Sequence, residues 1–338
     1  MSVIEPESKI AVLGAGSWGT ALAIQCARAG NSVRLWGRSS ALCAQMAAER
    51  RNPRYLPDAP FPDGLEIAHD LATALQGADD VLIVVPSHAF RELLLLIRDQ
   101  LTDGQRLCWA TKGFEIATGR LPAEVAREVL GTSRLTAVLS GPTFAREVGA
   151  GFPTAMTIAS RDHDYAAQLA HDFSSPVFRA YTSTDIVGVE VGGAVKNVLA
   201  IGAGLSDGLG FGANSRISLI TRGLVEMTRL GVALGAQRET FMGLAGLGDL
   251  VLTCTDDQSR NRRFGLLLAK GRGADAALAE IGQVVEGYKA TRALRAVAER
   301  EGVSMPICEG LHAVLYDGMS ADQVVKGLML RPIRPEFD

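Results

Sequence analysis

Residues 9–19 read KIAVLGAGSWG, a short apolar run followed by three glycines in the spacing Gly-x-Gly-x-x-Gly. The run Lys9–Leu13 predicts a buried strand, and Thr20–Ala29 predicts a helix that ends at Gly30. Between a strand and a helix, such glycines permit a tight turn and let the backbone approach a pyrophosphate, which the helix N-terminus stabilises. The stretch therefore predicts a dinucleotide-binding fold. The alternative, in a chain with 37 glycines, is a purely structural turn.

Further strand-like runs follow, separated by segments of helical character. They cover Ser32–Trp36, Asp80–Val85, Arg106–Ala110, Leu135–Leu139, Thr154–Ala159 and Val177–Ala180. Strands alternating with helices predict a mostly parallel sheet with helices on both faces. After Ser183 the residues follow helical spacing as far as Gly327. We therefore expect an α/β fold with two domains: a Rossmann-type, doubly wound sheet in residues 1–185 and an all-helical domain in residues 186–338.

Composition narrows the class of protein. Hydrophobic residues make up 47% and charged residues 21% of the 338 positions, which is ordinary for a globular protein. The formal net charge of −3 argues against electrostatic binding of nucleic acid or an anionic membrane. An anionic substrate would then need a local cluster of basic groups. A homodimer is expected only from its frequency among soluble enzymes.

Several features predict a cytoplasmic protein without a metal or a membrane span. The five cysteines show no CxxC spacing, the five histidines show no ligand-like spacing, and the first residues lack the pattern of a signal peptide. The apolar run Val187–Leu205 resembles a membrane span in length. Because it contains Glu190, Lys196 and Asn197, we expect a buried helix instead.

The region after the second strand bears on the choice of cofactor. Dinucleotide-binding domains usually place an acidic residue there, which binds the 2′-hydroxyl of the ribose. No Asp or Glu lies between Glu7 and Glu49, and Arg38 follows the second strand. Arg38 is either a surface arginine without a role or the group that binds a 2′-phosphate. We favour the second interpretation, which implies that NADP is accepted.

Polar residues also follow later strands, at Ser87, Lys112 and Gly141-Pro142-Thr143. In doubly wound sheets the ligand crevice lies outside the carboxyl ends of the strands. A single lysine after a strand is more often a surface residue. Its place at this edge nevertheless favours contact of Lys112 with a substrate or cofactor.

The helical part contains two polar segments in apolar surroundings. Lys196 either extends along its aliphatic stem to solvent or faces a ligand cavity, and a desolvated lysine of lowered pKa could exchange a proton near neutrality. Asp249 follows a glycine-rich loop as a ligand or a helix cap. Ser259-Arg260-Asn261 offers donors for a phosphate, although a solvated helix start is the commoner explanation of such a segment.

Taken together, these blocks resemble the bacterial NAD(P)-dependent glycerol-3-phosphate dehydrogenases. The resemblance runs from about Ile10 to Met329 and rests on blocks that occur in order. These are GAGSWGTALA, ATKGFE, SGPTFAREV, VEVGGAVKNVLAIGAGLSDGLGFGANS, GLAGLGDLVLTCTDDQSRNRRFG and VVEG. The resemblance implies interconversion of sn-glycerol 3-phosphate and dihydroxyacetone phosphate with NADH or NADPH, which supplies glycerol 3-phosphate for phospholipid biosynthesis.

The resemblance also implies roles for single residues. Lys196 would be the catalytic proton acceptor and would contact the substrate, with Asp249 orienting it. Besides the motif glycines Gly14, Gly16 and Gly19, the implied cofactor contacts are Ser17, Trp18, Arg38, Ala145, Val284 and Glu286. Lys112 and Arg260 would serve both ligands. The remaining substrate contacts implied are Gly141, Thr143, Asp249, Ser259 and Asn261.

Two rival functions are compatible with part of this pattern. A hydroxyacid dehydrogenase of the 6-phosphogluconate dehydrogenase-like type would also use a helical lysine, but it would lack the Ser259-Arg260-Asn261 cluster in this setting. A non-catalytic dinucleotide sensor would keep the glycine motif without needing Lys196, Asp249 and Arg260 together. Oxidation of NADPH on addition of dihydroxyacetone phosphate separates the three.

The absence of a nearby carboxylate and the position of Arg38 yield a testable prediction. Arg38→Asp should lower kcat/KM for NADPH about five- to thirtyfold more than for NADH, because an exposed guanidinium–phosphate contact contributes about 1–2 kcal/mol. Both cofactors are compared in both proteins at fixed ionic strength, since salt screens the contact. Equal losses for the two cofactors would show that Arg38 does not recognise the 2′-phosphate, and Arg34 would be tested next.

Overall fold

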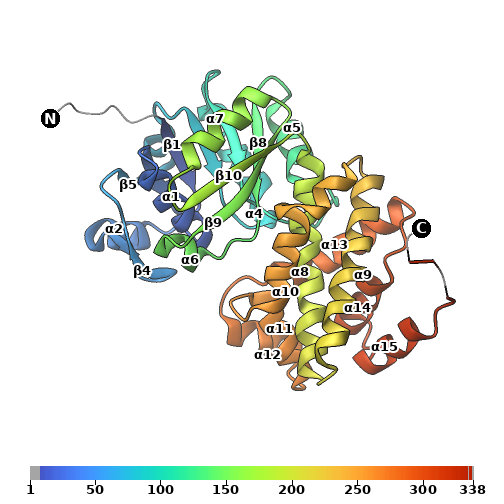
Figure 1. Cartoon of the computed structure of the whole chain (residues 1–338). Coiled ribbons are helices and arrows are strands. Elements are labelled where there is room, and N and C mark those ends of the chain that lie inside the picture. The colour runs from blue at the N-terminus through green and yellow to red at the C-terminus, as the bar shows by residue number, and fades with distance from the viewer. Residues whose placement is uncertain (1–7, 334, 337–338) are drawn as a thin grey trace.

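A computed structural model describes residues 8–333, 335 and 336 of the chain. A sheet covered by helices comes first, and a group of packed helices follows it (Figure 1). Residues 1–7, on which the expectation about a signal peptide partly depends, lie outside the described residues.

The sheet has eight strands in the order β10-β9-β8-β7-β6-β1-β2-β5. Neighbouring strands run parallel except for the antiparallel pair β8 and β9. The predicted Rossmann-type, mostly parallel sheet is therefore confirmed. The strand bounds are β1 Lys9–Leu13, β2 Ser32–Trp36, β5 Leu65–Ile67, β6 Asp80–Ile83, β7 Arg106–Trp109, β8 Thr136–Ser140, β9 Thr154–Ser160 and β10 Phe178–Ser183.

Helices cover both faces of this sheet. One apolar cluster joins β1 and β2 to α1 and α7 through Leu22 and Leu169, and a second joins the opposite face to α4 and α5 through Phe90 and Val125. The helical segments are α1 Ser17–Arg28, α2 Ser40–Glu49, α3 Leu71–Leu75, α4 Ser87–Ile97, η1 Arg98–Gln100, α5 Pro122–Leu130, α6 Ala145–Ala150 and α7 His163–Phe173.

Several elements in this part differ from their predicted bounds. Strand β6 ends at Ile83, two residues before its predicted end, and β10 extends to Ser183, three residues beyond its predicted end. Helix α1 begins at Ser17, three residues before the predicted start, because Gly16 already serves as its N-cap. Strand β5 and the small antiparallel pair β3 (Arg51–Asn52) and β4 (Leu56–Pro60) were not predicted. They are short, and β4 contains two prolines, so no apolar alternation marks them.

From Ile186 onward, no strand occurs among the residues that the structure describes, which confirms the prediction of a helical C-terminal part. Its segments are α8 Ile186–Gly208, α9 Gly212–Ala233, η2 Arg238–Met242, η3 Leu244–Gly248, α10 Asp249–Thr255, α11 Arg260–Ala269, α12 Ala274–Ile281, α13 Glu286–Arg300, α14 Pro306–Tyr316 and α15 Ala321–Met329.

Helix α8 is the centre of the helical part (Figure 1). It is the one described helix that is long and apolar enough to cross a membrane, but 94% of its most apolar window is buried inside the protein. The prediction of a buried helix for this run is confirmed. Its apolar faces pack against α9, α10, α13 and α14 through residues such as Val198, Leu199 and Leu294.

Glycines bring α8 and α11 unusually close together. A Cβ atom on Gly204 would lie 2.0 Å from the carbonyl oxygen of Arg262, and one on Gly265 would lie 2.1 Å from that of Ile201. Only residues without a side chain allow the two backbones to touch in this way. This contact places the N-terminus of α11 beside the middle of α8.

Candidate active site

The glycine motif forms the turn between β1 and α1. Gly14 has a φ of +126°, and a Cβ there would lie 2.2 Å from the carbonyl oxygen of Val84. A Cβ on Gly19 would lie 1.8 Å from the carbonyl oxygen of Gly14. Nothing lies within 4 Å of a Cβ on Gly16, so the turn is open at this point. The first two close approaches require glycine, and the open third position leaves room for a pyrophosphate at the start of α1.

Residues near this turn include an unpaired donor and an exposed cation. The indole Nε1 of Trp18, in the first turn of α1, is buried without a hydrogen-bond partner. Arg38 is exposed just after β2. Arg34, the alternative arginine, donates to the carbonyl oxygen of Thr73. A buried donor without a partner and a free guanidinium at the carboxyl edge of the sheet both fit a bound dinucleotide.

A buried cluster of charges joins the sheet to the helices. The Asp249 carboxylate, at the start of α10, is fully buried. Its Oδ2 accepts from Lys112 Nζ at 2.7 Å, and its Oδ1 accepts from Lys196 Nζ. Lys112 follows β7, and Lys196 lies in the middle of α8 with 6% of its surface exposed. The structure therefore brings three sequence-predicted site residues together. Lys196 does not extend to solvent, and Asp249 bonds lysines rather than capping a helix.

The pKa values of this cluster follow from burial and from the mutual charges. Burial lowers the pKa of Lys196 to about 7, with the nearby Lys112 ammonium acting in the same direction and the Asp249 carboxylate against it. For Asp249, burial alone would raise the pKa, but the two lysines outweigh burial and lower it. The cluster thus combines a stable carboxylate with an amine able to exchange a proton near neutral pH.

Two members of this cluster were missed by sequence reasoning. Thr253 Oγ1 accepts from Lys196 Nζ at 3.0 Å, and Ser140 Oγ lies 3.4 Å from Asp249 Oδ2. Thr253 follows Asp249 by four residues, which puts both on one face of α10, so helical spacing was a usable signal. Ser140 is the last residue of β8, directly before Gly141, and only the strand assignment could have pointed to it.

The Ser259-Arg260-Asn261 segment forms the start of α11 and is largely buried. Ser259 caps the helix by accepting from the backbone N–H of Arg262 at 3.2 Å. Asn261 Nδ2 donates to Asn197 Oδ1 at 2.9 Å, and Asn261 Oδ1 accepts from the backbone N–H of Gly287 at 2.9 Å. The segment is therefore not a solvated helix start. Asn197, which the sequence showed as a polar interruption of α8, ties α8, α11 and α13 together through Asn261.

Arg260 and Glu286 face each other where α11 meets α13. Burial lowers the pKa of Arg260, with the charge of Glu286 acting against it. Burial raises the pKa of Glu286 to about 7, opposed by Arg260, Lys289 and a hydrogen bond with Ser87. Ser87 begins α4 after β6, so this pair reaches the carboxyl edge of the sheet. Val284, by contrast, is 41% exposed just before α13.

The remaining predicted residues lie after β8. A Cβ on Gly141 would lie 2.9 Å from Met156 Cα, which explains a glycine there. Thr143 Oγ1 donates to the carbonyl oxygen of Gly141 at 3.2 Å, and Ala145 begins α6. Among the described residues, no hydrogen bond joins either of these two side chains to the lysine cluster, and both are half-buried.

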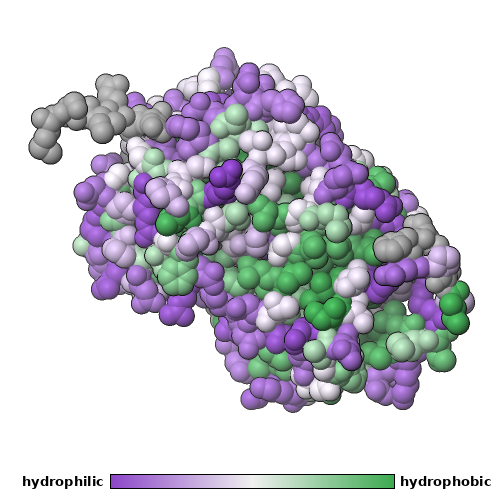
Figure 2. Space-filling view, in the orientation of Figure 1, coloured by the Kyte–Doolittle hydropathy of each residue, from purple (hydrophilic) through white to green (hydrophobic). Residues whose placement is uncertain are grey.

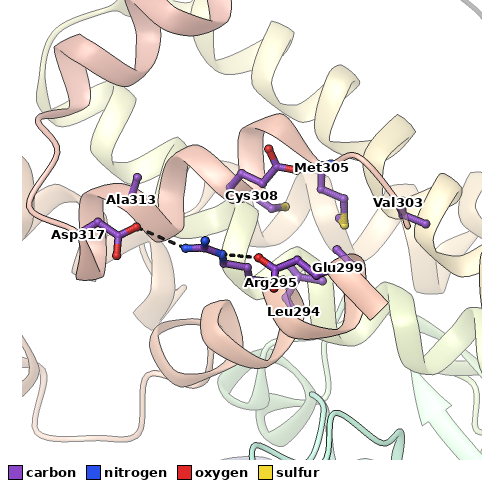
Figure 3. A pocket seen from close by; sticks show the side chains of 10 residues that line it. Leu294, Arg295, Glu299, Val303, Met305, Cys308, Ala313 and Asp317 are labelled. Atoms are coloured by element: carbon purple, nitrogen blue, oxygen red, sulfur yellow. Dashed lines mark hydrogen bonds and ion pairs between the residues drawn. The ribbon is translucent and has the colours of Figure 1, made fainter. Parts of the chain in front are cut away.

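A separate cavity of about 340 Å³ lies between α13 and α14 (Figure 3). Arg295 extends along its mouth toward Glu299 and Asp317, and Met305 and Cys308 line it from the other side. None of the sequence-predicted site residues lines this cavity. Within residues 8–333, 335 and 336, no three His, Cys, Asp or Glu side chains gather as metal ligands.

Comparison with known proteins gives consistent matches along the chain. Residues 9–166 match the family model described as NAD-dependent glycerol-3-phosphate dehydrogenase N-terminus, and residues 185–326 match the model for its C-terminus. The glycerol-3-phosphate dehydrogenase (NAD(P)+) of Tolumonas auensis is 54% identical over 328 residues, which cover 97% of this chain and 98% of that protein. That of Klebsiella pneumoniae is 55% identical and covers 96% of each. A crystal structure of glycerol-3-phosphate dehydrogenase from Coxiella burnetii has a TM-score of 0.92 at 46% identity, covering 96% of this chain and 99% of that one.

Proposed function

Because the chain belongs to the NAD-dependent glycerol-3-phosphate dehydrogenase family, we propose that Lys112, Lys196 and Asp249 form the catalytic centre of that reaction. The protein is an oxidoreductase that interconverts sn-glycerol 3-phosphate and dihydroxyacetone phosphate with NADH or NADPH, and it supplies glycerol 3-phosphate for phospholipid biosynthesis. The observation that supports the proposed centre most strongly is the buried Lys196, held by Asp249 beside Lys112. A helical lysine is also expected in the 6-phosphogluconate dehydrogenase-like alternative, but both family models and the 54% identical relative are glycerol-3-phosphate dehydrogenases.

The residues around the glycine turn are proposed to hold the cofactor. Gly14, Gly16 and Gly19 with Ser17 would take the pyrophosphate at the start of α1, and Trp18 Nε1 supplies a donor that lacks a protein partner. Further proposed contacts are Arg38, Lys112, Ala145, Arg260, Val284 and Glu286. When bound, the cofactor supplies or accepts the hydride at C2 of the substrate. The exposed Arg38 supports a preference for NADP.

Lys196 is proposed to move the proton. In the reductive direction its ammonium donates a proton to the carbonyl oxygen of dihydroxyacetone phosphate as C2 receives the hydride. In the oxidative direction the neutral amine removes the hydroxyl proton from glycerol 3-phosphate. Asp249 and Thr253 hold Nζ in place, and Lys112 adds positive charge where the oxygen becomes negative.

The start of α11 is proposed to bind the substrate phosphate. Arg260 supplies a guanidinium, and Ser259 and Asn261 present polar groups at a helix N-terminus, which favours an anion. Gly141 and Thr143 complete the proposed substrate contacts after β8. Because the chain has a net negative charge, an anionic substrate needs a local basic group, and Arg260 supplies one here.

We also propose a division into domains, a cellular location and an oligomeric state. We retain residues 1–185 as the dinucleotide-binding domain and 186–338 as the substrate domain; β10 ends at Ser183 and α8 begins at Ile186. Five free, buried cysteines support a cytoplasmic location. A homodimer has some support from an exposed apolar face over α9 and α10 (Figure 2), which includes Ile217, Val232 and Val251.

The proposed role of Lys196 predicts a large loss of turnover on its removal. Lys196→Ala should lower kcat by about 10²–10⁴-fold, the usual range for loss of a general acid–base group, with little change in cofactor binding. In the wild type, reduction requires protonated Lys196, so its rate should fall as pH rises through about 7, whereas the oxidation rate should rise. Stopped-flow absorbance of NADPH measures both directions.

Lys270→Ala serves as the matched control, because Lys270 is exposed at the end of α11. It should retain wild-type kcat and pH dependence. A Lys196→Ala variant with most of its kcat would refute the assignment and turn attention to Lys112.

The proposed phosphate site predicts that the effect of Arg260 depends on the substrate. Arg260→Ala should lower kcat/KM for dihydroxyacetone phosphate about 10- to 150-fold, since a hydrogen bond to a charged group contributes about 1.5–3 kcal/mol. The loss should be much smaller with dihydroxyacetone, which has no phosphate. Steady-state rates with both substrates at saturating NADPH make the comparison. Equal losses would show that Arg260 acts elsewhere, for example on the cofactor.

A further inference from the structure

Glu190 lies in α8 and joins three elements at a single oxygen atom. Its side chain is buried, and its Oε1 accepts from Trp109 Nε1 at 2.8 Å and from the backbone N–H of Ala123 at 2.9 Å. Trp109 is the last residue of β7, and Ala123 lies in the first turn of α5. Its other oxygen, Oε2, is buried without a hydrogen-bond partner.

Two of the three elements that meet at Glu190 place the lysines of the proposed centre: α8 contains Lys196, and β7 ends three residues before Lys112. Lys112 follows Trp109 by three residues, and Lys196 follows Glu190 by six along α8. Six residues correspond to about 9 Å along a helix and about 120° around it. Glu190 therefore lies on the side of α8 that faces the sheet, whereas Lys196 lies on another side of the helix, where it bonds Asp249. A bond at Glu190 thus restrains both the translation and the rotation of the helix that carries Lys196.

We propose that Glu190 is a positioning residue for the reaction, because its bonds to Trp109 and Ala123 set where Lys196 and Lys112 stand relative to Asp249. It acts through α8 and touches neither substrate nor cofactor. The inference rests on the proposed role of Lys196.

The charge state of Glu190 agrees with this role. Burial raises the pKa of Glu190 to about 8; the bonds from Trp109 and Ala123 oppose the rise, and the charge of Glu124 adds to it. Glu124, in the first turn of α5, is the charged side chain whose field acts on Glu190. Below about pH 8 the side chain is then a neutral acid. Above it, an unpaired buried charge forms beside α8 and disturbs the placement of Lys196. Because this carboxyl has an ordinary pKa of 4.5 in the unfolded chain, fold stability declines as pH rises from about 4.5 to about 8.

Glu226 offers a matched control within the same chain. It is also a buried carboxyl, on α9, and it accepts from the backbone N–H groups of Ile307 at 2.7 Å and Cys308 at 3.2 Å. Burial raises its pKa to about 7. Its hydrogen bonds hold the start of α14, and among the described residues none of them goes to a residue proposed for the site. Its loss should affect stability but not the geometry of Lys196.

The experiment compares Glu190→Ala and Glu190→Gln with Glu226→Ala and Glu226→Gln in the full chain. Melting temperature, kcat, and KM for dihydroxyacetone phosphate and NADPH are measured where each variant is folded. Both alanine variants should lower the melting temperature. Only Glu190→Ala should lower kcat, by about 10- to 100-fold, with KM nearly unchanged, since small misplacements of catalytic groups cost this much. Glu190→Gln should keep the wild-type kcat, because its amide oxygen can accept the hydrogen bonds from both Trp109 and Ala123.

The pH profile of glycerol 3-phosphate oxidation gives a second readout, which remains informative if Glu190→Ala does not fold. The wild type should gain activity through about pH 7 and lose it above about pH 8, whereas Glu190→Gln should keep its activity at the higher pH. Glu226→Gln should retain the wild-type decline. The same alkaline decline in wild type and Glu190→Gln, or equal kcat losses in the two alanine variants, would overturn the proposal.

Lys196→Ala, measured in parallel, separates this proposal from the proposed function. If Lys196→Ala keeps its kcat, the proposed catalytic role fails. If it loses kcat while Glu190→Ala behaves like Glu226→Ala, only the positioning role fails.

Discussion

The carboxylate of Asp249 is the group on which the proposed centre depends. It is fully buried between two lysines, one from the end of a sheet strand and one from the middle of the central helix. A buried charge is tolerated only when it is paired, and removing one partner of such a pair typically costs 3–5 kcal/mol. Asp249 therefore keeps Lys112 and Lys196 close together. Because Lys112 follows a strand of the sheet and Lys196 lies in α8, the same carboxylate also links the sheet to the helical part. The same burial leaves Lys196 with a pKa close to neutrality.

Two close backbone contacts in the fold depend on glycines. Gly14 and Gly19 allow the turn that begins α1, and Gly204 and Gly265 allow α8 and α11 to touch. The first contact opens the start of a helix toward a pyrophosphate. The second brings the Ser259-Arg260-Asn261 segment against α8, where Asn261 bonds Asn197. The proposed cofactor and phosphate sites thus both depend on close backbone approach.

Much of the fold could be predicted from the sequence because its signals are local. The apolar run before Gly14, the strands that precede Lys112 and Gly141, and the helical spacing after Ser183 each reflect a few neighbouring residues. Strands β3, β4 and β5 could not be predicted, since they are short and lack alternation. In the site, Lys196 and Asp249 were distinguishable as polar residues in apolar surroundings. The four-residue spacing of Asp249 and Thr253 was a usable local signal. The pairing of Lys196 with Asp249, and the bonds of Ser140 and Glu190, join residues far apart in the chain, and no local pattern encodes such contacts.

Burial and the Asp249 carboxylate together set the proton affinity of Lys196. An NMR titration of ¹⁵N-lysine-labelled protein, with the Nζ signal assigned by Lys196→Arg, measures this directly. Lys196 should titrate near pH 7 in the wild type, far below the ordinary lysine pKa of 10.5. It should titrate lower still in Asp249→Asn, because the carboxylate that raises its pKa is lost. A Lys196 signal that titrates at the ordinary lysine value in the folded protein would contradict the account.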